Sequence, residues 1–489
     1  MIKKIAIIGS GFAGLSAASI AAKEGHEVHL FEKNENIGGR ARQFTEKGFT
    51  FDMGPSWYWM PDVFERYFSK FGYKVNDLYK LIKLEPSFRI YFGDNDIIDV
   101  PSDATDLRDL FESIEEGAGK KLNKFLEEAE YKYNVGIKDL VYQPGSSIFE
   151  FANSSIIKGV IRLQVFTSFS KHVRKFFKNP KLIALMEFPV LFLGAMPKDT
   201  PALYSLMNYA GLELGTWYTE GGFGSVIKAM HKIAIEQGVH IHTNSPVQKL
   251  QTENGKITHI KVNNESIKID DVIATADYHH IEQEVLEEKD RTYSEKYWNS
   301  RTLAPSSLIF YLGVDKKLPL LEHHNLFFHS DFNKHSVEIY KDPKWPSDPL
   351  FYVCCPSKTD KTVAPDGHEN VFILIPIAPG IEDTQEIRDD YFNKTITRLE
   401  ALTGESIKEN IIYKKDYCVN DFKADYNSYK GNAYGLANTL KQTAIFKPKL
   451  KSKKVKNLYY AGHLTVPGPG VPPSIISGEV AVKELIKNK

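Results

Sequence analysis

The distribution of apolar and polar positions predicts that the chain begins with a βαβ unit. Residues 2–8 alternate weakly and are rich in β-branched side chains, which predicts a buried strand, and the small, alanine-rich segment 15–23 predicts a tightly packed helix. Gly25 ends this helix, and residues 27–31 predict a second strand. A glycine-rich turn at 9–14 joins the first strand to the helix. Such a unit is typical of the start of a doubly wound parallel sheet.

The pattern then alternates between helical and strand-rich stretches. Residues 103–131 repeat apolar side chains at helical spacing, and residues 151–215 are also mostly helical, with breaks at prolines. An Asn-Gly pair at 254–255 predicts a hairpin turn. Strands dominate residues 305–415, and the last helix is expected at 474–486.

Segments of cofactor-binding type lie at the start, the middle and the end of the chain, which predicts one discontinuous domain. We therefore expect an α/β fold with a discontinuous Rossmann-type cofactor-binding domain, an inserted mixed-sheet substrate domain and a helical subdomain that faces a membrane. The expected bounds are 1–85, 217–290 and 445–489 for the cofactor-binding domain, 86–105 and 291–444 for the substrate domain, and 106–216 for the helical subdomain.

The composition is that of a folded protein and narrows the range of partners. Lys and Arg number 62, as do Asp and Glu, so the formal net charge is zero and nucleic acid is not expected as a partner. Apolar residues make up 42% and charged residues 25%, which excludes wholesale disorder. The 12% aromatic content favours a large apolar cavity or a lipid-facing surface in addition to a core.

The cysteines and the most apolar segment favour a cytoplasmic protein. Cys354, Cys355 and Cys418 form neither a disulfide framework nor a metal-ligand pattern, so we expect no metal and a reducing compartment. The most apolar segment, 183–196, has 14 residues and contains Glu187. It is shorter than the ~20 residues that span a bilayer, so an integral membrane protein is not expected.

The turn at residues 9–14, Gly-Ser-Gly-Phe-Ala-Gly, has the glycine spacing of a dinucleotide-binding site. Gly9 allows the tight turn, Gly11 lets the backbone approach a pyrophosphate, and Gly14 lets helix and strand pack closely. The pyrophosphate then lies at the positive end of the helix. Glu32 ends the following strand, where a carboxylate accepts hydrogen bonds from ribose hydroxyls and disfavours a 2′-phosphate.

Three further segments favour FAD over NAD. Residues 38–42 are Gly-Gly-Arg-Ala-Arg, and residues 51–56 follow them. Arg40 supplies positive charge beside the pyrophosphate, and glycines such as Gly39 let backbone amides reach a large cofactor. Near the C-terminus, the Gly/Pro-rich loop 461–474 leads to the last helix, whose first amides would stabilise negative charge on a reduced flavin.

Together these motifs resemble those of the bacterial FAD-dependent carotenoid desaturases, the phytoene desaturase group of the flavin amine oxidase superfamily. The resemblance covers nearly the whole chain and is carried by 9–14, Glu32, 38–42, 51–61, 217–230, Val247, 274–277 and 461–474. It implies that the discontinuous Rossmann-type domain is an FAD-binding domain that holds FAD non-covalently. The matched lining positions are Ala13, Glu32, Arg40, Gly54, Pro55, Ser56, Val247, Gly462 and Val471, with Thr275 as a weaker match. The chain departs from the commoner pattern at Thr275 and Pro473, where Asn and Gly are usual.

The resemblance also implies a reaction and a substrate class. We expect desaturation of a long linear carotenoid, with phytoene as the expected substrate, by hydride transfer to the flavin followed by proton loss. A quinone or oxygen would act as the electron acceptor. The aromatic run 57–59 is expected to line an apolar tunnel, or else to belong to the core. No catalytic base is assigned, because a structural hydrogen-bonding role is favoured for His463 beside the flavin loop.

Three other functions remain open at this point. A 1-hydroxycarotenoid 3,4-desaturase would carry the same cofactor motifs. A flavin amine oxidase would need an aromatic cage for an amine, and no cysteine lies near the C-terminal loop to tether its flavin. A flavin-free lipid-binding protein of the escort type is disfavoured, because it would not need Glu32, residues 38–42 and the C-terminal loop all intact.

A basic, aromatic-rich segment predicts peripheral attachment to a membrane surface. Residues 151–186 contain no Asp or Glu. Phe and branched aliphatic side chains alternate with basic residues in this segment, which is typical of a helix that lies on a membrane. The alternative is a solvated helix face. The basic residues are Lys158, Arg162, Lys171, Arg174, Lys175, Lys178 and Lys181.

Overall fold

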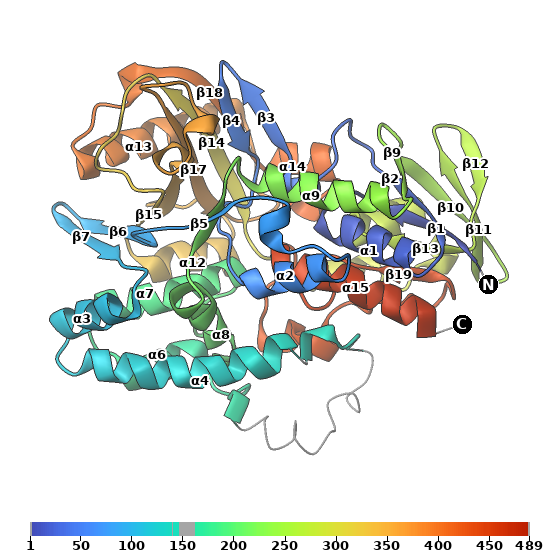
Figure 1. Cartoon of the computed structure of the whole chain (residues 1–489), viewed down its shortest axis with the longest axis horizontal. Coiled ribbons are helices and arrows are strands. Elements are labelled where there is room, and N and C mark those ends of the chain that lie inside the picture. The colour runs from blue at the N-terminus through green and yellow to red at the C-terminus, as the bar shows by residue number, and fades with distance from the viewer. Residues whose placement is uncertain (1, 139, 146–161, 488–489) are drawn as a thin grey trace.

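The computed structural model describes residues 2–138, 140–145 and 162–487 and has a parallel sheet on the side that carries both chain ends (Figure 1). The strand order is β19-β13-β1-β2-β9, and all neighbouring strands are parallel. Strands far apart in the sequence thus meet in one sheet, as the predicted discontinuous Rossmann-type arrangement requires. The strands are β1 (Lys4–Ile8), β2 (Glu27–Phe31), β9 (His240–His242), β13 (Asp271–Ala274) and β19 (Leu458–Tyr460).

Helix α1 (Phe12–Lys23) follows β1 and confirms the predicted βαβ unit. It packs against α15 (Val471–Lys487) and α9 (Phe223–Glu236), and α2 (Pro61–Ser69) lies beside α15. The α1–α15 contact is close, since a Cβ at Gly478 would lie 2.4 Å from the carbonyl oxygen of Ala13. A glycine at position 478 of α15 is therefore needed for this close packing.

A second sheet has seven strands in the order β18-β14-β17-β16-β15-β6-β7. It is mixed, because β15 and β6 are parallel and the other pairs are antiparallel. This sheet matches the predicted mixed sheet, and α12 (Phe332–Tyr340) and α13 (Gln385–Thr403) accompany it (Figure 1). The strands are β6 (Phe88–Gly93), β7 (Asp96–Val100), β14 (Ser306–Val314), β15 (His324–Phe327), β16 (Phe351–Cys354), β17 (Glu369–Ile377) and β18 (Ile411–Tyr417).

Smaller sheets complete the strand structure. The predicted hairpin is present: Asn254 and Gly255, both with positive φ, join the strands β10 and β11. Two short ribbons pair β3 with β4 and β5 with β8. Their bounds are β3 (Gln43–Glu46), β4 (Phe49–Asp52), β5 (Leu81–Lys83), β8 (Trp217–Thr219), β10 (Val247–Glu253), β11 (Lys256–Val262) and β12 (Glu265–Lys268).

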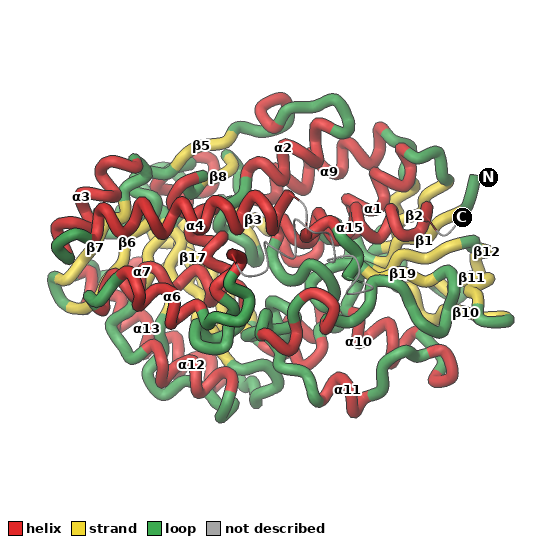
Figure 2. Tube along the Cα trace, turned by 90° about the horizontal axis from the view of Figure 1, so that it is seen from below, coloured by secondary structure: helices red, strands yellow, loops and turns green. Residues whose placement is uncertain are grey.

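A helical layer forms the lower edge of the molecule in Figure 1 and faces the viewer in Figure 2. The helical stretches predicted from 103 and from 151 onward contribute to it, although residues 146–161 lie outside the described part. Among the described residues, no helix combines the length and apolar character needed to cross a bilayer. The helices are α3 (Ala104–Ile114), α4 (Ala118–Lys138), α6 (Phe169–Phe176), α7 (Pro180–Glu187) and α8 (Leu206–Asn208).

The last helix begins earlier than predicted, at Val471 instead of residue 474. Pro472 and Pro473 lie in its first turn, where the missing N–H groups of proline would have no helical partner in any case. Residues 471–473, which the sequence analysis assigned to the end of the Gly/Pro-rich loop, thus form the first turn of α15. Strand β13 ends at Ala274, because the amides of Thr275 and Ala276 both donate to the Ile8 carbonyl.

Candidate functional site

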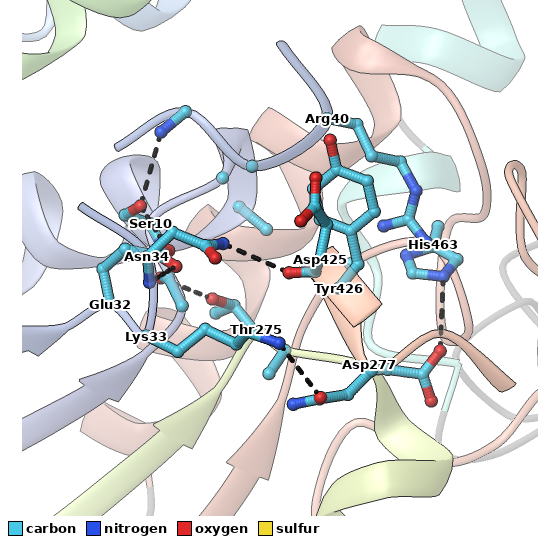
Figure 3. Close-up of a pocket in the computed structure, with 18 of the residues that line it drawn as sticks. Ser10, Glu32, Lys33, Asn34, Arg40, Thr275, Asp277, Asp425, Tyr426 and His463 are labelled. Atoms are coloured by element: carbon cyan, nitrogen blue, oxygen red, sulfur yellow. Dashed lines mark hydrogen bonds and ion pairs between the residues drawn. The ribbon is translucent and has the colours of Figure 1, made fainter. Parts of the chain in front are cut away.

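A cavity of about 700 Å³ lies at the carboxyl ends of the parallel strands, the edge at which ligands of doubly wound sheets bind (Figure 3). Ile8 and Phe31 end β1 and β2, and Thr275 follows β13, so these strand ends form one wall. The structure brings most predicted cofactor residues together here. Those that line the cavity are Gly9, Gly11, Ala13, Glu32, Gly39, Arg40, Gly54, Pro55, Val247, Thr275, Gly462 and Val471.

Gly14 and Ser56 are the two predicted residues that do not line this cavity. Gly14 has the packing role expected of it, since a Cβ there would lie 1.9 Å from the carbonyl oxygen of Gly9. Ser56 points elsewhere, and its Oγ lies 2.9 Å from the hydroxyl of Tyr352 on β16. After Pro55 the chain therefore turns from the cavity toward the seven-stranded sheet.

The glycine turn leaves the N-terminus of α1 open toward the cavity. Gly9 has φ of 100°, a conformation that favours glycine, and its amide donates to the Phe31 carbonyl at 2.8 Å. Gly11 is the N-cap residue, and no side chain caps the helix there. The first amides of α1 are therefore oriented to bind an anion such as a pyrophosphate.

Glu32 is held in place by the turn itself (Figure 3). It is 5% exposed, and its Oε2 accepts from the backbone N and the Oγ of Ser10 at 3.0 and 2.6 Å. Its Oε1 accepts from the amide of Asn34 at 2.9 Å. A carboxylate has about four acceptor positions, so one remains for a ribose hydroxyl.

Thr275 has a structural contact at the end of β13. Its hydroxyl lies 2.9 Å from the carbonyl oxygens of both Ile8 and Gly9, to either of which it donates. This contact fastens the end of β13 to the glycine turn. Gly14 leaves room for the same hydroxyl, since a Cβ at that position would lie 2.8 Å from Thr275 Oγ1.

Arg40 lines the cavity, and a segment that carries no motif holds it there. Its Nη2 donates to Ser428 Oγ and to the Asn432 carbonyl, both at 3.3 Å, and its guanidinium lies 4.9 Å from the ring centre of Tyr426. The Nε of Arg40 has no partner among the described residues. Arg42 lies outside the cavity lining and pairs with Asp425 at 2.5 Å.

Residues 422–434, which sequence analysis did not assign to the site, close one side of it. Phe422, Asp425 and Tyr426 of α14 (Val419–Tyr426) line the cavity. Asn34 Nδ2 donates to the Asp425 carbonyl at 3.1 Å, which joins this segment to the residues after Glu32 (Figure 3). Asn34 could have been assigned to the site from the sequence, because it follows Glu32 by two residues. Residues 422–434 could not, because tertiary packing alone places them here.

His463, whose side chain is 16% exposed, lies beside Asp277 on the wall formed by the C-terminal loop (Figure 3). Burial, together with the positive charges of Arg40 and Lys447, holds the pKa of His463 well below its usual value. Its Nε2 lies 4.0 Å from Asp277 Oδ2, too far for a hydrogen bond. Asp277 instead accepts from the amides of Tyr429 and His280, at 3.1 and 3.2 Å. A neutral His463 is therefore the form that this site favours.

The aromatic run 57–59 packs into the interior of the protein. Tyr58 and Trp59 are buried, with Tyr58 donating to or accepting from the hydroxyl of Tyr79 at 2.8 Å. Trp59 Nε1 donates to Thr216 Oγ1 at 2.9 Å. None of the three aromatic residues lines the cavity described above, so a role in a tunnel stays a prediction.

Comparisons with known proteins agree with this architecture. The family model for flavin-containing amine oxidoreductases matches residues 12–486. The chain is 40% identical over 485 residues to a carotenoid 3,4-desaturase of Haloarcula japonica, covering 99% of this chain and 98% of that protein. It is 31% identical over 498 residues to a 4,4'-diapophytoene desaturase of Staphylococcus aureus, covering 99% of each.

A solved structure supports the fold alone. The crystal structure of an oxidoreductase from Methanosarcina mazei superposes with a TM-score of 0.64 at 16% identity, covering 99% of this chain and 100% of that one. The family match and the two relatives confirm the resemblance found in the motifs. The chain belongs to the flavin-containing amine oxidoreductase family and, within it, to the carotenoid desaturases.

Proposed function

We propose that the protein binds FAD non-covalently in this cavity and desaturates a long linear carotenoid. The observation that carries the proposal is the convergence on one cavity of Glu32 with two helix N-termini, α1 at Gly11 and α15 at Val471. The first turn of α15 contains no acidic residue to repel an anionic cofactor group. No cysteine is among the described residues that line the cavity, which supports non-covalent binding.

The protein's own part in the reaction is to orient the cofactor and to exclude water. When bound, the flavin supplies the acceptor for the hydride that leaves an allylic carbon. The N-terminus of α15 would stabilise negative charge on its carbonyl edge. Ile309, Leu374 and Ala433 give the cavity apolar walls. No described residue is assigned as the base for the following proton loss.

The substrate that the comparisons favour is a carotenoid whose 3,4 bond is oxidised. Phytoene was the substrate expected from the motifs, but the match to the 3,4-desaturase, at 40% identity, is higher than the 31% for the diapophytoene desaturase. We therefore propose a 1-hydroxycarotenoid 3,4-desaturase, with phytoene desaturation as the second candidate.

A direct comparison of substrates tests this choice. Purified, flavin-loaded protein is incubated in lipid vesicles with phytoene or with a 1-hydroxycarotenoid, and products are separated by chromatography with absorption spectra. We expect the hydroxylated substrate to gain one double bond and to react faster by more than about tenfold, because a site built for a hydroxyl rejects an analogue that lacks it. Preferential turnover of phytoene contradicts the choice, and turnover of small amines alone points to an amine oxidase.

Two simpler measurements address the cofactor and the acceptor. An absorption spectrum of the purified protein shows whether it contains flavin, and acid release identifies that flavin as FAD. This distinguishes the enzyme from a flavin-free lipid-binding protein. We propose a quinone or oxygen as the electron acceptor, and anaerobic turnover with an added quinone distinguishes between them.

Peripheral attachment to the cytoplasmic side of a membrane is the proposed location. Helix α6 buries Phe169, His172 and Val173 and exposes Lys171 and Lys175 on its other face. Phe166, just before the helix, is 84% exposed. The exposed Phe166 supports an apolar anchor at this surface. The anchor would be smaller than the sequence suggested, because Phe169 and Phe177 belong to the core. Residues 151–161 of the predicted segment lie outside the described part.

The charge reversal Lys171→Glu, Lys175→Glu and Lys178→Glu is expected to reduce binding to anionic liposomes by more than about tenfold, since each basic residue near such a surface contributes ~1 kcal/mol. Arg174 is left unchanged because it pairs with Glu187. Co-sedimentation with liposomes measures the effect, with the exposed Lys232→Glu of α9 as the control. Equal sedimentation of wild type and the triple variant, both loaded with flavin, would assign the contact to another surface.

A further inference from the structure

Three buried side chains with metal-binding chemistry meet between β15 and β16. His324, the first residue of β15, is the register partner of Cys354, the last residue of β16, and His323 precedes His324. One ring nitrogen of each histidine and the Cys354 sulfur lie within 4.8 Å of one another. The three residues are 4%, 1% and 4% exposed, in the order His323, His324 and Cys354. None of them lines the FAD cavity.

The hydrogen bonds of the two imidazoles leave one nitrogen of each available. His323 Nδ1 lies 2.8 Å from Thr359 Oγ1, and His324 Nδ1 lies 2.6 Å from the Tyr352 hydroxyl. The Nε2 atoms of both rings are buried and have no partner among the described residues. A hydroxyl that accepts from Nδ1–H leaves Nε2 with its lone pair, which is the arrangement found around metal-bound histidines.

A small void and a nearby carboxylate complete the setting. A space of about 20 Å³, enough for a single atom or ion, is lined by His323, Cys354 and Asp52, and His324 lies next to His323 outside this lining. Asp52 is held by Gln43 Nε2 at 2.8 Å and by the amide of Phe223 at 2.9 Å. A divalent ion, the Cys354 thiolate and the Asp52 carboxylate together would carry no net charge, so the buried site would be balanced.

We propose that His323, His324 and Cys354 bind one zinc ion. Two imidazoles and a thiol are the ligand set of zinc and not of magnesium or calcium, which prefer oxygen. On binding, the Cys354 S–H bond is broken, its proton passes to solvent, and the thiolate sulfur bonds to the metal without any change of oxidation state. Zn–N bonds of ~2.0 Å and a Zn–S bond of ~2.3 Å require the ligand atoms to approach by small side-chain movements.

The proposed ion would fasten the segment before the FAD cavity to the seven-stranded sheet. The ring of Trp57 stacks on His324 with centroids 4.0 Å apart, and Ser56 shares a hydrogen bond with Tyr352. Gly54 and Pro55, directly before them, line the cavity. The ion would thus have a structural role, and the proposal is independent of the carotenoid substrate. Sequence analysis expected no metal, because these ligands meet only through the pairing of β15 with β16.

Metal analysis of the tag-free, flavin-loaded protein tests the proposal. Protein made in zinc-containing medium and dialysed without a strong chelator is expected to hold about one zinc per chain, with two nitrogens and one sulfur among the scatterers in X-ray absorption. Wild-type protein that holds no zinc even when produced with excess zinc overturns the proposal. So does a bound zinc with only nitrogen and oxygen neighbours, which is adventitious.

Variants assign the ligands and separate loss of metal from loss of fold. Cys354→Ser and His323→Gln are expected to lower zinc content at least about tenfold in protein that keeps a cooperative thermal transition. Cys355→Ser is the matched control, because the adjacent Cys355 thiol points to Ser357 and Glu369, at 3.6 and 3.7 Å. Undiminished zinc in folded Cys354→Ser overturns the assignment. If a variant does not fold, the sulfur signal of the wild-type metal decides.

Discussion

Replacing Gly11 by valine is expected to give a folded but colourless protein. Gly11 lines the cavity, and its backbone is extended at φ of −69° and ψ of −176°, which valine adopts without strain. A Cβ at Gly11 would have Gly39 Cα, at 4.0 Å, as its nearest neighbour, so the chain itself leaves room for the side chain. The valine methyl groups would occupy space beside the first amides of α1, where the pyrophosphate is proposed to bind. We expect flavin content to fall by at least about tenfold.

Gly14→Val is the matched comparison, since it lies in the same turn with the opposite expectation. A Cβ at Gly14 would lie 1.9 Å from the Gly9 carbonyl oxygen, which is backbone and has no room to move. This variant is expected not to fold, whereas Gly11→Val keeps its thermal transition in the absence of flavin. Flavin absorption per chain and thermal unfolding measure the two effects. Full flavin occupancy in Gly11→Val would place the pyrophosphate elsewhere.

The parts of the fold that sequence analysis predicted well are those in which local pattern and tertiary packing agree. The β1–α1–β2 unit was predicted from its glycine spacing. The spacing is informative because close backbone contacts in the structure leave little room for a side chain at Gly9 or Gly14. The hairpin at Asn254 and Gly255 was recognised because both residues adopt the positive φ that this turn demands. The start of α15 was misplaced, because its first turn contains Pro472 and Pro473 and looks like a loop in sequence.

The site was predictable only where its residues belong to motifs. Glu32 was placed by its distance from the glycine turn, and its contacts with Ser10 follow from that local geometry. Tyr426 and Asn432 were not predictable, since they reach Arg40 from far along the chain through the packing of α14. The pairing of His324 with Cys354 was hidden for the same reason. Long-range pairing between elements without a motif carries no signal in a single sequence.

Lys447→Met is expected to stabilise the protein, although it removes a charged residue. Lys447 is 2% exposed, and its Nζ has no hydrogen-bond partner among the described residues. Burial lowers the pKa of Lys447 to about 7. Methionine has a similar length and flexibility and needs no partner, so it should fill the same space. At pH 7 the expected gain in the free energy of unfolding is on the order of 4 kcal/mol.

The sign of the pH dependence distinguishes this explanation from a general packing effect. Between the folded pKa of about 7 and the unfolded value near 10.5, the unfolded chain holds a proton on Lys447 that the folded chain does not. The stability of the wild type should therefore rise with pH across this window, relative to Lys447→Met, and the advantage of the variant should be largest at pH 7 and below. Chemical denaturation of both proteins at several pH values measures the difference.

A nearby lysine provides the control for this last expectation. Lys449 Nζ donates to the carbonyls of Gly145 and Ile445, each at 2.9 Å. Lys449→Met removes these bonds and is expected to destabilise the protein, because the carbonyls lose a charged donor. If Lys447→Met is also destabilising at pH 7, the Lys447 ammonium has a partner that burial alone does not reveal. A stabilised Lys447→Met that retains flavin but loses turnover would instead show that this buried amino group, beside Gly468 of the C-terminal loop, is kept for activity at a cost in stability.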